Sequence, residues 1–99
     1  MHGNSKQNPN LHHLYGIFEQ VTEDVFKYGI SDDPIDEDGL SNRARRQLFI
    51  FNLAAGFLKY YAVIMRKDIP GRAEAERIER EYINVHQEKY GHNPPGNLR

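Results

Sequence analysis

The chain has 99 residues, of which 38% are hydrophobic and 27% are charged, and it contains no cysteine. This length allows one domain with a modest core. The absence of cysteine excludes disulfides, thiolate metal sites and cysteine nucleophiles. No apolar run approaches the roughly 18 residues that a membrane-spanning helix needs, and the polar start lacks the apolar segment of a signal peptide. The formal net charge of −1 argues mildly against a protein that grips duplex nucleic acid.

The two ends of the chain differ in composition from the middle. Residues 1–10 are mostly polar, with Gly and Pro among them, and we interpret them as a flexible leader. We expect residues 11–99 to form a single domain. After about residue 90 this domain continues as a tail rich in Gly, Pro and Asn, a composition that disfavours regular secondary structure.

A β-hairpin is predicted near the start of the domain. Residues 14–21 and 25–31 are rich in aromatic and β-branched residues, which favours two strands. The residues between them offer no Gly or Asn for a two-residue turn, so a three- or five-residue connection fits better. Either connection places odd-numbered residues opposite odd-numbered residues, and opposed residues share a face.

This pairing divides the hairpin into two faces of different character. The face predicted to pack on the core carries Leu14, Gly16, Phe18, Phe26, Tyr28 and Ile30. The other face combines apolar residues with charged and hydroxyl groups, and it carries Tyr15, Ile17, Glu19, Lys27, Gly29 and Ser31. We therefore expect this mixed face to be the working face of the domain.

Two helices and a third strand are predicted after the hairpin. Residues 32–39 form an acidic loop, which fails as an EF-hand because a proline would occupy the first ligand position. We expect this loop to be solvated. Ser41 is a suitable N-cap for a helix that Gly56 would end. Residues 59–66 favour a strand, and residues 72–90 favour a second helix.

The predicted order of elements is β-β-α-β-α. This order indicates an α+β fold in which a small three-stranded antiparallel sheet is flanked by helices.

Glu79 interrupts the apolar pattern of the second predicted helix. At about 100° per residue, Glu79 falls inside the apolar sector, whose members are Ala75, Ile78, Tyr82, Ile83 and Val85. A carboxylate on a packing face is costly unless it is paired or bound to a metal. Glu79 is therefore either an edge residue paired with an arginine, or a ligand for a hard cation or a general base.

Other charged and titratable side chains give weaker signals. Arg43 and Gln47 lie one turn apart on the first predicted helix, and the planar fork of an arginine suits phosphate oxygens. A solvated basic face is the alternative interpretation. No pair among the five histidines has the spacing of metal ligands, so we expect each of them at the surface or at an edge.

The ordered combination of these motifs resembles the GIY-YIG nuclease superfamily. The resemblance rests on Tyr15-Gly16-Ile17, on Lys27-Tyr28-Gly29-Ile30-Ser31, and on the helices that carry Arg43 and Glu79. More narrowly, the chain is similar to the C-terminal toxin domains of bacterial polymorphic toxins. The leader segment from His2 to Lys6 and the tail segment from Pro94 to Asn97 also look like that toxin group.

The resemblance implies a divalent-metal-dependent endonuclease that hydrolyses nucleic-acid phosphodiesters. Tyr15 corresponds to the family's first catalytic tyrosine, and Lys27 stands where the second usually stands. The catalytic arginine corresponds to Arg43, with Arg46 as the alternative. Glu79 corresponds to the glutamate that binds Mg²⁺ or Mn²⁺. Either Tyr15 or Lys27 would act as the general base.

The resemblance also implies partners and a place of action. The substrate is expected to be nucleic acid, with DNA favoured over RNA, and to contact Arg46, Gln47, Ser31 and Asn97. A cognate immunity protein is implied as a partner. We expect no binding to a membrane. The domain would be secreted as part of a larger bacterial effector and act in the cytoplasm of the target cell.

Two other interpretations stay open. In the first, the same fold is a non-catalytic protein-interaction domain that uses the mixed hairpin face. In the second, the nuclease site is degenerate, and Lys27 in place of tyrosine marks its decay.

Overall fold

The structure of the chain, a computed structural model, describes residues 8–97. It confirms the predicted α+β class and the order β-β-α-β-α. The elements are β1 (Leu11–Glu19), β2 (Val25–Ser31), α1 (Asn42–Ala55), β3 (Tyr60–Pro70) and α2 (Arg72–Tyr90).

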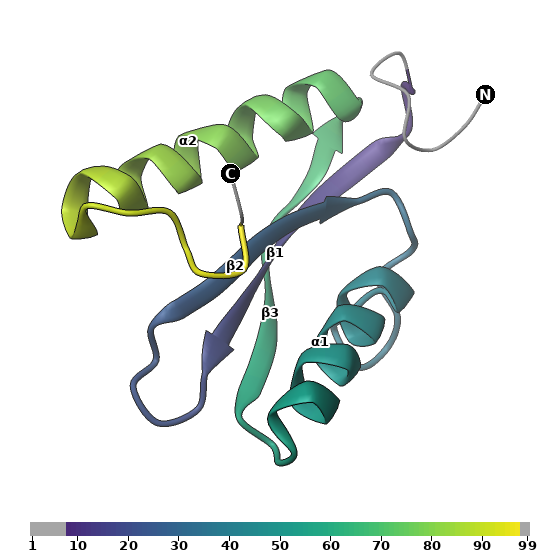
Figure 1. The fold of residues 1–99 in the computed structure, drawn as a ribbon. Helices are drawn as coiled ribbons and strands as arrows, with labels where there is room; N and C mark the ends of the chain where they lie inside the picture. The colour runs from purple at the N-terminus through teal and green to yellow at the C-terminus, as the bar shows by residue number, and fades with distance from the viewer. Residues whose placement is uncertain (1–7, 98–99) are drawn as a thin grey trace.

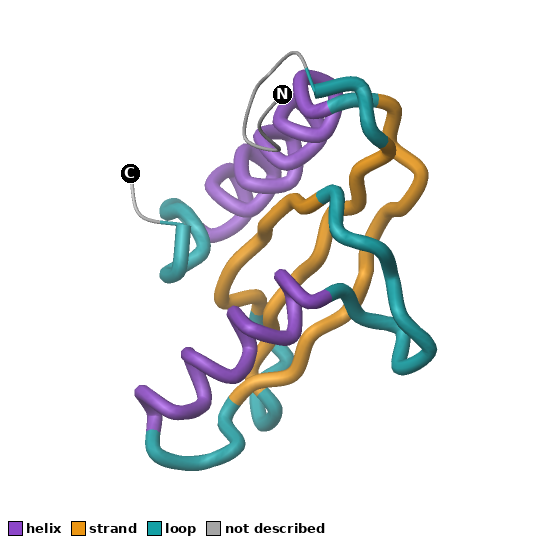
Figure 2. The backbone as a smooth tube through the Cα atoms, turned by 90° about the vertical axis from the view of Figure 1, so that its right-hand side faces the viewer, coloured by secondary structure: helices purple, strands orange, loops and turns teal. Residues whose placement is uncertain are grey.

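The three strands form one antiparallel sheet in the order β2-β1-β3, so that β1 is central and β2 is an edge. Figure 1 shows α2 crossing one end of the strands and α1 lying beside the other end. Figure 2 shows that the sheet is strongly twisted between these two helices. The edge strand β2 therefore comes close to both helices.

The hairpin has the predicted pairing of odd with odd residues. Tyr15 pairs with Gly29 and Ile17 pairs with Lys27. The bounds of β2 match the prediction, whereas β1 is displaced toward the N-terminus: it begins at residue 11 instead of 14 and ends at residue 19 instead of 21. The connection between the strands has the five residues 20–24, which is one of the two lengths predicted.

A bulge near the turn corrects one predicted position. The register shifts between Ile17 and Phe18, and such a shift turns the side chains beyond it. Phe26 was expected on the same face as Leu14. It instead packs with Phe51 and Tyr60, at ring-centroid distances of 5.0 and 4.7 Å, on the face covered by α1.

A core cluster lies on each face of the sheet, which corrects the expectation that only one face of the hairpin packs on a core. Under α2 the core consists of Leu14, Ile69, Ala75 and Ile78. Under α1 a second core consists of Tyr15, Ile17, Ala44 and Tyr60. Tyr15 and Ile17 belong to the face predicted as mixed, so that face is largely covered by α1.

The ends of α1 follow the predicted signals. The Ser41 hydroxyl accepts a hydrogen bond from the Ala44 backbone N–H at 3.3 Å, which satisfies one of the free donors at a helix start. Gly56 ends the helix with a φ of +83°, a backbone conformation that glycine adopts without strain. The second helix has the predicted bounds, and β3 continues four residues beyond its predicted end.

Segments outside the regular elements are tied to the sheet. The leader was predicted over residues 1–10, of which 1–7 lie outside the described residues. Asn8 is buried, and its amide donates to Asp32 at 2.9 Å. In the tail, Pro94 is fully buried, and the Gly96 backbone N–H donates to the Phe26 carbonyl at 2.6 Å. The domain therefore includes residues on both sides of the five elements.

Three histidines that were expected at the surface or at an edge are buried. His12 and His13 lie on the central strand, where both faces are covered. The Nε2 atom of His13 lies 2.8 Å from the Ser41 hydroxyl. His86 lies under the tail, and its Nδ1 atom is 2.8 Å from the His92 carbonyl oxygen. The histidine at position 2 lies outside the described residues.

The acidic loop is exposed to solvent, as expected, and its carboxylates also form contacts with α1. Arg45 pairs with Asp36 and Asp38 at 2.6 and 3.2 Å. The Asp33 carboxylate accepts a hydrogen bond from the Arg43 backbone N–H at 3.1 Å. These carboxylates contact the start of α1, while residues 34–39 of the loop stay exposed to solvent as expected.

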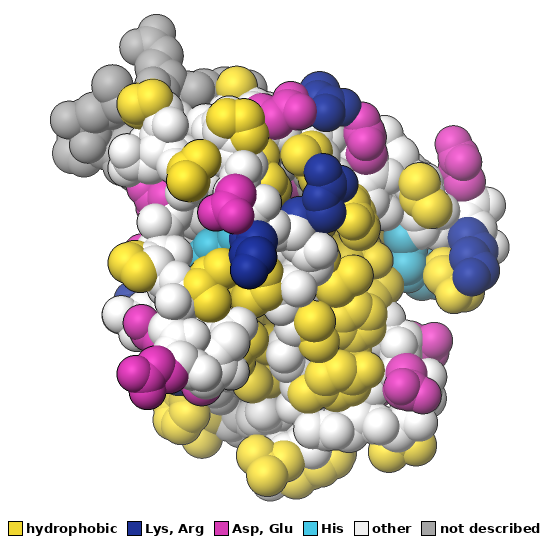
Figure 3. All heavy atoms as spheres, turned by 180° about the vertical axis from the view of Figure 1, so that it is seen from behind, with side chains coloured by type: hydrophobic (Ala, Val, Ile, Leu, Met, Phe, Trp, Pro, Cys, Tyr) yellow, Lys and Arg dark blue, Asp and Glu magenta, His cyan; other side chains and the backbone are white. Residues whose placement is uncertain are grey.

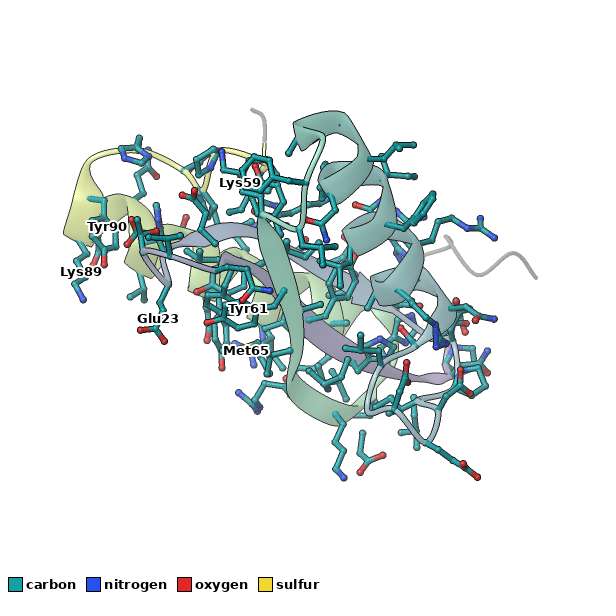
Figure 4. The ribbon with its side chains drawn as sticks, turned by 90° about the horizontal axis from the view of Figure 1, so that it is seen from below. Glu23, Lys59, Tyr61, Met65, Lys89 and Tyr90 are labelled. Carbon is teal, nitrogen blue, oxygen red and sulfur yellow. The ribbon has the colours of Figure 1, made fainter. Side chains whose placement is uncertain are left out.

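Part of the sheet face beyond α2 remains accessible. Figure 3 shows hydrophobic side chains gathered in a band across the back of the molecule. Tyr61 and Met65 project from β3 on the side where Lys89 and Tyr90 end α2 (Figure 4), and Phe18 stacks on Tyr61 at 5.5 Å. Within residues 8–97, neither helix is long and apolar enough to cross a membrane.

Candidate active site

Tyr15 reaches the candidate site by crossing the edge strand. It lies on β1 directly opposite Gly29 of β2, and a Cβ atom at position 29 would overlap the Tyr15 ring. Because Gly29 has no side chain, the ring can lie across β2 and bring its hydroxyl toward the edge of the sheet. There the phenol lies beside Arg43, which acts to lower its pKa.

Four elements contribute to one pocket of about 240 Å³ at this edge. Tyr15 comes from β1, Lys27 from β2, Arg43 from α1 and Glu79 from α2. These are the four side chains that the sequence singled out as catalytic candidates. The structure brings all four to the lining of the same pocket.

The environment of Tyr15 favours the neutral phenol. Burial raises the pKa of Tyr15 above its usual value of 10.0, and the negative charge of Glu79 acts in the same direction. The adjacent Arg43 opposes this rise without cancelling it. Tyr15 is therefore placed to donate a hydrogen bond at neutral pH rather than to accept a proton.

The environment of Lys27 lowers its pKa, which makes the amine easier to deprotonate. Burial lowers the pKa of Lys27 from its usual value of 10.5, and the positive charge of Arg43 lowers it further. Glu79 opposes this effect. The Nζ atom of Lys27 donates a hydrogen bond to the side-chain oxygen of Gln47 and lies 5.6 Å from the centre of the Phe51 ring. These contacts hold the amine in one position.

The side chain of Asn97 is engaged by the backbone of β2. Its Oδ1 atom accepts from the Tyr28 N–H at 2.8 Å, and its Nδ2 atom donates to the Tyr28 carbonyl at 2.9 Å. Asn97 was predicted to bind substrate. It lines the pocket, but both groups of its amide hold the tail against the edge strand.

The other predicted substrate-binding residues lie around the pocket. Arg46 and Ser31 line an adjoining pocket that also contains Arg43. The hydroxyl of Ser31 accepts from the backbone N–H of Asp33 at 3.0 Å, which is a local loop contact. Gln47 contacts the site because its side-chain oxygen accepts a hydrogen bond from Lys27.

Arg72 lines the site and was missed by the sequence analysis. It is the first residue of α2 and lines the pocket together with Arg43 and Glu79. Its Nε atom lies 3.0 Å from the Glu76 carboxylate. A cation at a helix N-terminus opposes the helix dipole, and this unfavourable placement is a signal that could have drawn attention to it.

The residues present are compatible with one Mg²⁺ ion. Among residues 8–97, no group of three or more histidine, aspartate and glutamate side chains is placed to hold a metal. Glu79 is the one acidic side chain among the described residues that line the pocket. Mg²⁺ commonly takes only one or two protein carboxylates and completes its shell with water and substrate phosphate. A single carboxylate facing the pocket fits this chemistry.

Comparison with protein families identifies the domain. Residues 5–91 match the model of the family Tox-URI2, described as URI fold toxin 2. The chain belongs to this family. It is therefore a toxin domain with the URI fold, and the match covers all five elements of the sheet and helices. No match was found among curated proteins or among solved structures.

Membership of the URI fold toxins agrees with the toxin resemblance noted in the sequence. A toxin domain of this kind implies an immunity protein as a partner in general.

Proposed function

We propose that this toxin domain is a metal-dependent nuclease of the GIY-YIG type that hydrolyses nucleic-acid phosphodiesters. One observation carries the proposal: Tyr15, Lys27, Arg43 and Glu79 converge from four elements on one polar pocket. A phenol, an amine, a guanidinium and a carboxylate together provide the groups that phosphodiester hydrolysis needs.

Arg43 would bind the scissile phosphate. Its guanidinium can donate two parallel hydrogen bonds to phosphate oxygens, and it would stabilise the negative charge that builds on them during attack. Arg72 lines the same pocket and adds a second positive charge. The earlier alternative, Arg46, lines the neighbouring pocket instead, which favours Arg43 as the catalytic arginine.

Lys27 is the better candidate for the general base. A base must be unprotonated before it takes a proton from the attacking water, and burial lowers the pKa of Lys27 toward that state. The bond to Gln47 orients the amine. Burial raises the pKa of Tyr15, so we assign Tyr15 to orienting the water or the phosphate through its hydroxyl.

Glu79 would hold a Mg²⁺ or Mn²⁺ ion, with water completing the coordination shell. When bound, such an ion supplies stabilisation of the charge on the leaving oxygen. The protein's own contribution would be to direct the Glu79 carboxylate into the pocket beside the arginine and the lysine.

As a toxin, the domain would act on nucleic acid inside a target cell. The substrate is nucleic acid, with DNA favoured over RNA, and an immunity protein would block the activity. The domain would be delivered as part of a secreted effector and act in the cytoplasm of the target cell. The competing interpretation, a protein-interaction domain that uses the mixed hairpin face, is weakened because Tyr15 and Ile17 on that face are buried.

The test uses Glu79→Gln and Arg43→Ala, with Glu88→Gln on the exposed side of α2 as the control. With Mg²⁺ and either plasmid DNA or total RNA, we expect the unmodified domain and the control to cleave. Both site variants should lose cleavage while circular dichroism and thermal unfolding stay unchanged, and EDTA should abolish cleavage. Full activity in a folded Glu79→Gln protein would refute the metal assignment.

A further inference from the structure

Three polar pockets adjoin along α2 and the edge of β2. The candidate active site shares Arg43 and Arg72 with the pocket on one side. It shares Arg72, Glu79 and Asn97 with the pocket on the other side, which has a volume of about 390 Å³. Because neighbouring pockets share their walls, they form one groove with the candidate site in the middle.

The two ends of this groove differ in charge. At one end, Arg43, Arg46 and Arg72 outnumber two aspartates, and both aspartates already accept hydrogen bonds within the protein. This end suits phosphate. At the other end, the positive charges of two arginines are balanced by the negative charges of two glutamates. That end therefore does not favour an anion.

The balanced end is rich in carboxamides. Asn84 and Gln87 project into it from α2, and Asn93 from the tail. In the described part of the chain, no hydrogen bond engages these three side-chain amides. They differ in this respect from Asn97, whose amide is occupied by the backbone of Tyr28.

Carboxamides on a surface whose charges balance fit a nucleobase. Each amide offers a donor and an acceptor, which match the edges of bases. Ile83 lines the same pocket and supplies apolar surface for the face of a base. The volume of this pocket, about 390 Å³, lies at the lower end of the range found for small-molecule sites. Only a single strand, or an unpaired loop, exposes a base edge fully.

We propose that the amide-lined end of the groove is a binding site for one nucleobase of a single-stranded nucleic acid. The strand's phosphates lie across the arginines, and the base next to the scissile phosphate enters the pocket of Asn84 and Gln87. This inference rests on the proposed nuclease function and adds a base preference on one side of the cleaved bond.

The test is a binding measurement without catalysis. Fluorescein-labelled single-stranded 12-mers of DNA and RNA, identical except for one central base, are titrated with the domain in EDTA and followed by anisotropy. A well-formed amide–base pair discriminates by roughly 5- to 150-fold, so we expect the preferred base to bind at least about fivefold more tightly than the others. Duplexes of the same sequence should bind more weakly.

The variant Asn84→Ala/Gln87→Ala should lose this preference while its affinity for the disfavoured strands stays within about twofold. The matched control is Glu88→Ala/Lys89→Ala, on the same helix but outside the groove lining, and it should keep the preference. Thermal unfolding of both variants verifies their folding. An unchanged preference in Asn84→Ala/Gln87→Ala, or no preference in the unmodified domain, would overturn the base site.

Failure of the base site and failure of the nuclease are distinguishable. If the domain cleaves with Mg²⁺ but shows no base preference, the base site is wrong and the nuclease stands. If the domain binds single strands with the expected preference but does not cleave, the groove assignment stands and the catalytic assignment is wrong.

Discussion

At the scale of single residues, Gly29 links the core to the candidate site. Tyr15 is almost fully buried, yet its hydroxyl contacts Arg43 at the edge of the sheet. The ring achieves both by lying across the position where a side chain on residue 29 would stand. A glycine on the edge strand is therefore needed for the close approach of this ring.

We predict that Gly29→Ala destabilises the domain. The added methyl group would displace the Tyr15 ring, and such overpacking typically costs about 1–3 kcal/mol. Urea unfolding of the variant measures this loss. The double variant Tyr15→Ala/Gly29→Ala removes the clash, so its destabilisation should be smaller than the sum of the two single changes. Additive losses would show that the ring does not occupy this position.

The second residue-scale prediction concerns the pH dependence of cleavage. If the neutral Lys27 amine is the base, the rate rises with pH as this group loses its proton. Burial lowers the pKa of Lys27, so the rise should occur at a lower pH than for a free lysine. Lys27→Arg keeps the positive charge but stays protonated. We expect this variant to lose the pH-dependent rise, and an unchanged profile would exclude Lys27 as the base.

At the scale of elements, asparagine side chains secure two strands in the same way. Asn97 of the tail accepts from the N–H of Tyr28 on β2 and donates to its carbonyl. Asn52 of α1 accepts from the N–H of Tyr60 at 2.8 Å and donates to its carbonyl at 3.3 Å. Each amide takes the place of a missing neighbouring strand, and the tail covers part of the exposed edge of β2.

We predict that Asn97→Ala loosens the edge of β2 and costs about 1–3 kcal/mol of unfolding free energy, because it leaves the Tyr28 backbone groups unpaired. Hydrogen exchange should become faster at the Tyr28 amide and stay unchanged at the Tyr60 amide. Asn52→Ala is the matched control and should have the reverse effect. Equal exchange at Tyr28 in Asn97→Ala and in the unmodified domain would contradict the role of the tail.

At the scale of the whole molecule, one sheet supports two cores. The helices cover opposite faces at opposite ends of the strands (Figure 1), so the central strand is buried on both sides. This arrangement places His13 in the interior beside Ser41. A buried histidine makes the stability of the fold depend on pH.

Burial lowers the pKa of His13 from its usual value of 6.5, and Asp33 opposes this shift. The unfolded chain then binds a proton more readily than the folded chain. The contribution of His13 to stability is therefore fully present above about pH 6.5 and decreases as the pH falls toward the folded pKa. We predict that the free energy of unfolding is lower at pH 5.5 than at pH 7.5.

His13→Gln should reduce this difference between the two pH values, because glutamine does not titrate. The exposed His92 provides the control, and His92→Gln should keep the pH dependence. Urea unfolding at both pH values measures the effect. If the free energy of unfolding depends on pH in His13→Gln as it does in the unmodified domain, groups other than His13 cause the pH dependence.

Much of the fold could be predicted because its signals are local. The alternation of residues in the hairpin, the capping residues Ser41 and Gly56, and the period of α2 act over a few positions. These signals determined the fold class, the element order and the pairing of odd with odd residues in the hairpin, whereas the pairing of Tyr15 with Gly29 was seen only in the structure. The apolar pattern of α2 also singled out Glu79, since a carboxylate within such a pattern is visible without a structure.

The rest depended on segments that meet only after folding. The bulge that turns Phe26, the covering of the mixed face by α1 and the docking of Asn97 on Tyr28, 69 residues away in the chain, have no local signal. The same holds for the entry of Arg72 into the site. The direction of the Lys27 and Tyr15 pKa shifts was likewise decided by the tertiary structure, because desolvation is set by which parts of the chain pack together.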